Sequence, residues 1–218
     1  MNLTRSYAQQ ILSEASSLNS GPWFQHSLLT GLAAQRIASL LTNLNPERAY
    51  IAGLLHDIGR RYGRTDLKHT IDGHRYLQSF GQDFYSRICL THSFPTRMVG
   101  SYFGKVDVTQ EELRQIQNFI ENVEYNDYDR LIQLCDHLAH PNGYCIVEKR
   151  MVDVALRYGV QEAHKDKWAK ILEIKNDFDS RIGKSVYALL PGICYGTFGT
   201  EDLLPIRSGD PEGDLIGE

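Results

Sequence analysis

Residues 50–60 read Tyr50-Ile51-Ala52-Gly53-Leu54-Leu55-His56-Asp57-Ile58-Gly59-Arg60, an apolar run that ends in an adjacent histidine and aspartate. Ionisable side chains are costly to bury unless they are paired. Imidazole nitrogens and carboxylate oxygens are good ligands for divalent first-row metals. The pair therefore indicates a metal site at the end of a helix. The alternative is a histidine that interacts with the carbonyl end of its helix, followed by an unrelated turn acid.

Further candidate ligands occur on both sides of this pair. His26 precedes it, His69 and His92 follow it, and Asp136 comes later. Each of them alone would be a common hydrogen-bonded core histidine or a salt-bridge acid. The ordered set of histidine, histidine–aspartate, histidine, histidine and aspartate is far more specific than any one member.

This ordered set resembles the HD-domain metal-dependent phosphohydrolases, a helical superfamily named for the adjacent pair. The resemblance extends from about Phe24 to about Asp136. It is carried by Gln25-His26-Ser27-Leu28, Gly53-Leu54-Leu55-His56-Asp57-Ile58-Gly59, His69-Thr70-Ile71-Asp72-Gly73, Thr91-His92 and Leu134-Cys135-Asp136. The order of motifs is that of the two-metal branch, which includes symmetrical diadenosine tetraphosphate hydrolases and cyclic-di-GMP phosphodiesterases.

The resemblance implies a site for two divalent metal ions, with iron or manganese favoured. His26, His56, Asp57 and Asp136 are expected to hold one ion. His69 and His92 are expected to hold the second, with Asp57 bridging through its two oxygens. His74 is the alternative to His69 for this role. Residues five apart on a helix point about 140° from each other, so only one of the two can be a ligand. We take His69, which shares its motif with Gly73, as the ligand.

Two positions depart from the cyclic-di-GMP enzymes. Their Gly-Tyr-Pro loop is missing after His92, where the chain reads Ser93-Phe94-Pro95, and this argues against a cyclic dinucleotide. Arg60 stands where those enzymes usually carry a lysine, so a cation is retained.

Basic residues cluster just after the histidine–aspartate pair. Arg60, Arg61 and Lys68 are expected to bind substrate phosphates, with Arg97 as a further candidate. Arginine is suited to this role because its guanidinium binds phosphate through two parallel hydrogen bonds. Asp57 and Arg60 are the expected catalytic residues. The alternative for the cluster is favourable charge at a helix C-terminus, followed by a solvated loop.

Apolar residues at helical spacing predict an all-α fold with no sheet. Ser20 with Pro22, and Asn45 with Pro46, have the pattern of helix starts, and Gly59 that of a helix stop. Two helices joined by a short loop pack antiparallel, so His26 and His56 should meet. The expected helices lie around 7–12 and over 22–41, 46–58, 67–80, 82–92, 109–121, 128–139, 147–158, 165–182 and 185–190.

Composition predicts a single helical domain over residues 1–198, with its metal core at about 22–140, and a flexible acidic tail over 199–218. The 218-residue chain carries a net charge of −4. From Glu201 onward there are six acidic residues and one basic residue, which leaves a nearly neutral body. A nucleic-acid polymer is therefore not an expected partner.

We expect a cytoplasmic protein without a membrane partner. No apolar run reaches the ~18–20 residues that span a bilayer, and the N-terminus lacks a secretory apolar core. Cys89, Cys135, Cys145 and Cys194 form no Cys-x-x-Cys pair and are expected to be reduced thiols. The sequence gives no indication of oligomeric state.

These observations favour a metal-dependent phosphohydrolase that acts on a small phosphorylated molecule, with a nucleotide as the favoured substrate. Metal-bound hydroxide would attack phosphorus while the cations stabilise charge on the phosphoryl oxygens. The alternative is a metal-stabilised regulatory module that binds a nucleotide without cleaving it.

Overall fold

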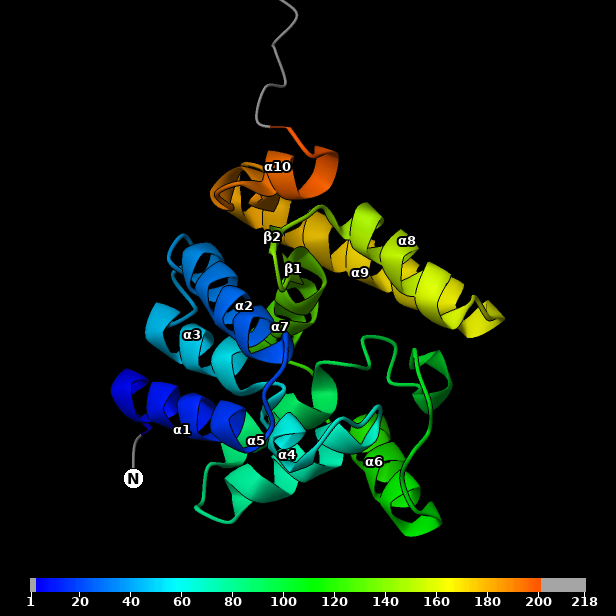
Figure 1. Cartoon of the computed structure of the whole chain (residues 1–218). Helices are drawn as coiled ribbons and strands as arrows, with labels where there is room; N and C mark the ends of the chain where they lie inside the picture. Colours follow the sequence, from blue (N-terminus) through cyan, green and yellow to red (C-terminus); the bar gives the residue numbers. More distant parts are fainter. Residues whose placement is uncertain (1–2, 201–218) are drawn as a thin grey trace, which may run out of the picture.

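A computed structural model describes residues 3–200, and its regular structure is almost entirely helical (Figure 1). The α-helices are α1 (Arg5–Leu18), α2 (Trp23–Ala38), α3 (Pro46–Leu55), α4 (Lys68–Gln78), α5 (Asp83–Thr91), α6 (Gln110–Asn122), α7 (Asp127–Leu138), α8 (Val147–Tyr158), α9 (Glu162–Ile182) and α10 (Ile193–Phe198). Three short 3-10 helices are η1 (Ile58–Tyr62), η2 (Val99–Ser101) and η3 (Val186–Leu189). The all-α prediction is confirmed.

Some local details differ from the sequence-based expectation. A short antiparallel hairpin pairs β1 (Ala139–His140) with β2 (Gly143–Tyr144), so the expectation of no sheet was wrong. The segment expected as a helix over 185–190 is the 3-10 helix η3. Asn45 caps α3 by accepting a hydrogen bond from the Arg48 amide at 2.9 Å, but Ser20 caps nothing, because Pro22 itself precedes α2. Most of the expected tail lies outside the described residues.

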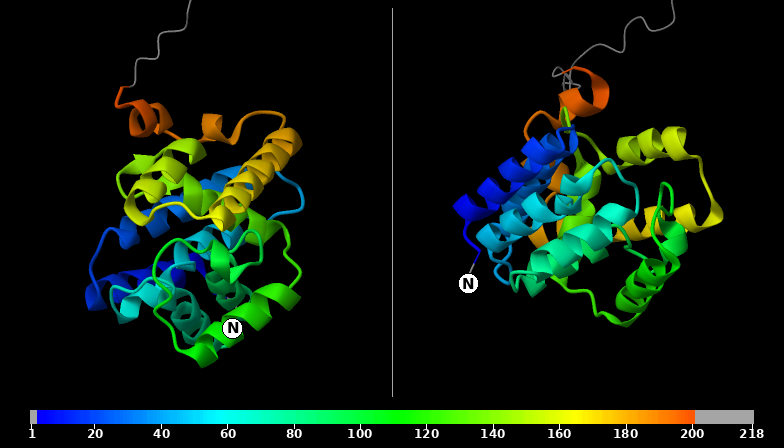
Figure 2. Two further views of the ribbon diagram at one scale, coloured as in Figure 1. Left: turned by 90° about the vertical axis from the view of Figure 1, so that its right-hand side faces the viewer. Right: turned by 60° about the horizontal axis from the view of Figure 1, so that its bottom comes forward.

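Helix α7 occupies the middle of the molecule, with α4, α5 and α6 on one side and α8, α9 and α10 on the other (Figure 1). In the right-hand view of Figure 2, α1 and the pair α8 and α9 lie at opposite edges of the molecule. Helix α7 packs against α2, α3, α5, α8 and α9, and Leu131, Leu134 and Leu138 are fully buried. Residues from the N-terminal half and from the C-terminal helices therefore share one apolar core around α7.

The antiparallel helices α2 and α3 approach each other closely where two glycines face each other. A Cβ atom on Gly53 would lie 2.8 Å from the Cα of Gly31, and a Cβ on Gly31 would lie 2.8 Å from the carbonyl oxygen of Tyr50. These distances are shorter than any normal contact, so only glycine permits this packing. The close approach brings His26 of α2 next to His56 at the end of α3.

A second glycine pair places α4 against η1. Gly59 lies inside η1 and does not end a helix, in contrast to the sequence-based expectation. A Cβ on Gly59 would collide with the backbone carbonyl of His69, and one on Gly73 would lie 3.0 Å from the Gly59 amide nitrogen. This contact holds the His69 backbone beside the histidine–aspartate pair.

All four cysteines are free, and Cys89, Cys135 and Cys145 are buried, as expected for reduced thiols. No helix within residues 3–200 is long and apolar enough to cross a membrane.

Replacing Gly53 with alanine tests the α2–α3 contact. We expect Gly53→Ala to lower the free energy of unfolding by about 1–3 kcal/mol, because the helices must separate. That cost should exceed the ~1 kcal/mol that alanine gains in helix propensity. Urea unfolding measures it. Gly100→Ala is the control, since a Cβ there meets nothing within 4 Å, and it should change stability by less than about 0.5 kcal/mol. Equal stability of the two variants would contradict the argument.

Candidate metal centre

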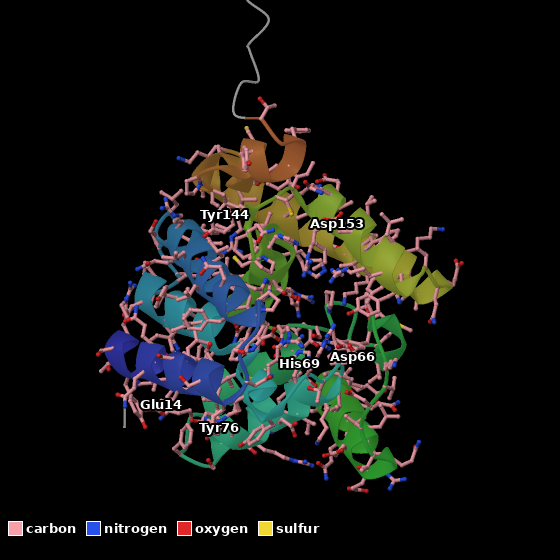
Figure 3. All side chains as sticks on the ribbon, viewed as in Figure 1. Glu14, Asp66, His69, Tyr76, Tyr144 and Asp153 are labelled. Atoms are coloured by element: carbon pink, nitrogen blue, oxygen red, sulfur yellow. The ribbon has the colours of Figure 1, made fainter. Side chains whose placement is uncertain are left out.

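The six predicted ligands come from five different segments and meet at the centre of the fold. His26 lies on α2, His56 and Asp57 connect α3 to η1, His69 lies on α4, His92 follows α5, and Asp136 lies on α7. All are buried except Asp136, whose side chain is 22% exposed. Figure 3 labels His69 in this central region.

One half of the cluster combines His26, His56 and Asp136. The Nε2 atoms of His26 and His56 are 3.2 Å apart. The Oδ1 atom of Asp136 lies 2.9 Å from the first and 3.7 Å from the second. The Oδ1 atom of Asp57 lies 3.9 Å from the His56 Nε2. Three residues of this half, His26, His56 and Asp57, are spaced to hold a metal ion.

The other half combines Asp57, His69 and His92, whose spacing also suits a metal ion. The Asp57 Oδ1 atom lies 3.0 Å from the Nε2 of His69 and 3.6 Å from that of His92. Those two Nε2 atoms are 3.4 Å apart. Asp57 is therefore common to both halves, as the sequence predicted.

Only one oxygen of Asp57 faces the histidines. The other, Oδ2, accepts a hydrogen bond of 2.6 Å from Nε of Arg60. The expectation of bridging through both oxygens differs from this arrangement, because Arg60 holds Oδ2 on the side of η1. Oδ1 is thus the Asp57 oxygen nearest the histidines of both halves.

Every histidine of the cluster is oriented by a backbone carbonyl. A carbonyl can only accept, so each Nδ1 carries the proton and each Nε2 presents a lone pair. The pairs are His26 with Ala139 at 3.2 Å, His56 with Gly53 at 2.6 Å, His92 with Ile88 at 3.1 Å, and His69 with Asp66. Figure 3 shows Asp66 and His69 beside each other.

This donor set fits divalent metal ions. The pairs of Nε2 lone pairs face each other at 3.2 and 3.4 Å, and two acceptors cannot share a hydrogen bond. Ser93 Oγ lies 3.0 Å from the His92 Nε2 and can donate to that one atom. A cation between the acceptors would satisfy all of them. Neutral imidazoles whose other nitrogen donates to a carbonyl are typical metal ligands.

The electrostatics keep both carboxylates ionised. Burial alone would raise the pKa of Asp57, but Arg60 and His69 outweigh it and hold that pKa well below its usual range. His26 and His56 do the same for the pKa of Asp136 against the effect of burial. Both groups are therefore ready to bind a cation near neutral pH.

The histidines differ in how readily they bind a proton. Burial and the neighbouring His56 lower the pKa of His92 to about 3, so this ring stays neutral. Burial opposes a charge on His56 too, but Asp57 and Asp136 outweigh it and raise its pKa. A proton therefore competes with a cation at His56.

A cavity of about 740 Å³ opens directly onto this cluster. His26, Asp57, His69, His92 and Asp136 all line it. The volume is in the range of small-molecule sites in proteins. The candidate metal centre is thus the floor of a pocket large enough for a substrate.

The predicted phosphate-binding residues separate into two groups. Arg60 lines the cavity. The other three predicted residues make contacts elsewhere. Arg61 lies over the ring of Tyr76 at 3.8 Å.

Lys68 forms ion pairs with Asp72 at 3.0 Å and with Glu112 at 3.3 Å. Arg97 lies over the ring of Tyr125 at 5.0 Å. None of these three lines the cavity.

The cavity also has basic residues that the sequence analysis missed. Arg150 and Arg157 on α8 and Lys167 on α9 line it, as do His137 and His140. The signal for α8 was present, because Arg150, Val154 and Arg157 follow the i, i+4, i+7 spacing of one helix face. The sequence could not show that this face turns toward the metal centre.

His74 lies outside the cluster. Its Nδ1 hydrogen-bonds the backbone carbonyl of Ser86 at 3.1 Å, and it does not line the cavity. Of the two competing histidines, the structure brings only His69 to Asp57.

Comparison with known proteins agrees with this geometry. The family model described as HD domain matches residues 23–140, a segment that contains all six candidate ligands. Searches of the curated proteins and of the solved structures found no match.

Metal stoichiometry tests the ligand assignment. After loading with Mn²⁺ or Fe²⁺ and removal of excess metal, we expect two ions per chain by elemental analysis. His69→Ala should lose one ion, because it removes one of the three donors of its half. His74→Ala is the matched control on the same helix and should keep both. Equal metal content in the two variants would contradict the assignment.

Proposed function

The chain belongs to the HD-domain family, and on that premise we propose that it is a metal-dependent phosphohydrolase acting on a small phosphorylated molecule. The observation that carries the proposal is the convergence of four Nε2 lone pairs and the Asp57 Oδ1 atom at the floor of a cavity. A purely structural metal site is normally enclosed by its ligands. Donors that border a cavity leave room for a substrate.

Divalent ions held by these residues would supply Lewis acidity, which activates a water nucleophile and neutralises charge on a phosphoryl group. The residues of the chain do the remaining work. Asp57 contributes one oxygen to both halves of the cluster and is itself oriented by Arg60. The carbonyls bound to the four Nδ1 atoms fix the rings and so reduce reorganisation during the reaction.

Arg60 serves as a positioning residue and faces the substrate space. Its Nε donates to Asp57 and its Nη1 donates to the Thr65 carbonyl at 3.0 Å, which fixes the guanidinium plane. The same side chain lines the cavity. A phosphoryl group above the donor cluster would therefore meet a cation of fixed orientation.

A nucleotide is the favoured substrate class. The cavity volume of about 740 Å³ suits a molecule of that size. The mixture of polar and aromatic lining residues, among them Trp23 and Phe103, suits a base and a sugar as well as phosphate.

A broad panel of nucleotides and phosphorylated metabolites, assayed for phosphate or nucleotide release, tests the proposal. With Fe²⁺, Mn²⁺ or Co²⁺ loaded, we expect turnover of at least one compound. Asp57→Ala should reduce kcat/KM by more than about a hundredfold, because it removes the oxygen common to both halves. Circular dichroism establishes that the variant is folded. Retained turnover in Asp57→Ala would contradict the role of the metal centre in the reaction. Two bound metals with no turnover across the panel would favour a nucleotide-binding module without catalysis.

Arg60 and its neighbour offer a matched pair of variants. Arg60→Gln should lower kcat/KM by about tenfold to a hundredfold, because Asp57 loses its orienting partner. Arg61→Gln, next in the chain but packed on Tyr76, should leave kcat/KM within about twofold. Steady-state kinetics on the substrate found in the panel measures both. Similar losses in the two variants would contradict the positioning role of Arg60.

A further inference from the structure

One face of α8 forms a wall of the cavity, although α8 lies beyond the segment that the HD-domain family model matches. Arg150, Val154, Arg157 and Tyr158 all line the cavity. The match ends at residue 140. This wall is therefore a feature of this chain's own C-terminal helices.

The two arginines of the wall have no carboxylate partner within residues 3–200. Arg157 donates through Nε to the backbone carbonyl of Asp153 at 3.2 Å, which leaves its charge unpaired. Arg150 makes no side-chain hydrogen bond to the described residues. Lys149, on the same helix, differs because it pairs with Asp153 at 3.4 Å. The unpaired cations of α8 are thus the ones that face the cavity.

Lys167 of α9 adds a buried cation to the same wall. It is only 5% exposed, and among the described residues its Nζ donates one hydrogen bond, to the Ser93 carbonyl at 3.0 Å. The ammonium group has three donors, so two remain. Burial lowers the pKa of Lys167 to about 8, although Asp136 opposes the shift. A buried ammonium with unused donors beside a cavity is a strong indication of an anionic ligand.

No acidic side chain of the cavity forms an ion pair with this wall within residues 3–200, although Asp136 acts on Lys167 at longer range. Asp57 and Asp136 belong to the donor cluster. Asp66, which also lines the cavity, accepts a hydrogen bond from the Lys105 amide at 3.2 Å. The negative charge is therefore concentrated at the floor, where metal ions would offset it, and the wall stays positive.

We propose that Arg150, Arg157 and Lys167 bind a second anionic group of the substrate, so that the substrate class is phosphorylated molecules with at least two separate anionic groups. This inference rests on the proposed function, in which the donor cluster and Arg60 engage the phosphoryl group that reacts. The wall then holds a phosphate or carboxylate at the other end of the same molecule. Arginine binds both groups through paired charge-assisted hydrogen bonds.

Matched pairs of compounds test the inference. The pairs are fructose 6-phosphate with fructose 1,6-bisphosphate, adenosine 5′-monophosphate with adenosine 3′,5′-bisphosphate, and glycerol 3-phosphate with 3-phosphoglycerate. The first two pairs add a phosphate and the third adds a carboxylate. Calorimetric Kd values are measured with the full-length Mn²⁺-loaded protein for compounds that are not cleaved, and kcat/KM for those that are.

We expect Kd or kcat/KM to favour the doubly anionic member by at least about tenfold in one or more pairs. A charge-assisted hydrogen bond contributes enough binding free energy for a difference of this size. The double variant R150Q/R157Q should reduce the preference to about twofold or less. It should leave the values for the singly anionic member nearly unchanged. Lys149→Gln, on another face of the same helix, should keep the full preference.

Two results would overturn the inference: no preference in any pair, or a preference that persists in R150Q/R157Q. Failure of the proposed function looks different. In that case nothing is cleaved, yet the Kd preference for the doubly anionic member and its loss in R150Q/R157Q remain. Cleavage without any preference would instead support the hydrolase and remove the anion-binding wall.

Discussion

The arrangement of the whole core depends on a set of buried acceptors that face one another. Four Nε2 lone pairs and two ionised carboxylates meet at the floor of the cavity, on side chains of which all but Asp136 are buried. Buried acceptors without donors cost free energy, and the rings cannot supply donors to one another, because each Nδ1 proton is already donated to a backbone carbonyl. We propose that bound cations offset this cost. The cluster then resembles other metal sites, in which hydrogen bonds from surrounding groups fix the orientation of each ligand.

Close backbone contacts make this convergence possible. The six ligands come from segments as distant as α2 and α7, so each segment must approach the centre to within the reach of one side chain. Gly31 against Gly53 allows this for His26 and His56, and Gly59 against Gly73 allows it for Asp57 and His69. Two of these glycines flank the histidine–aspartate pair in the sequence. Close backbone packing, and not the ending of a helix, explains why glycine occupies these two positions.

The sequence predicted the floor of the site but not its walls. Ligand order and helical periodicity were sufficient for the floor, because each ligand sits at a helix end or on an apolar helix face that must turn inward. The phosphate-binding prediction relied on closeness in sequence to His56 and Asp57. That criterion fails because η1 turns successive side chains in different directions, so Arg60 faces the cavity while Arg61 packs on Tyr76. Arg150 and Lys167 are remote in sequence, and only tertiary packing brings them to the cavity.

The cavity wall that contains Arg150, Arg157 and Lys167 is connected to the candidate metal ligands through Ser93. Lys167 donates to the carbonyl of Ser93, the residue that follows His92, so its ammonium group is held at a fixed place relative to the candidate ligands. Selectivity depends on the difference in binding free energy between competing substrates. A fixed cation in the cavity wall contributes to that difference without changing the donors at the floor. Helices outside the family core can therefore determine which phosphorylated molecule enters, while the core determines what happens to it.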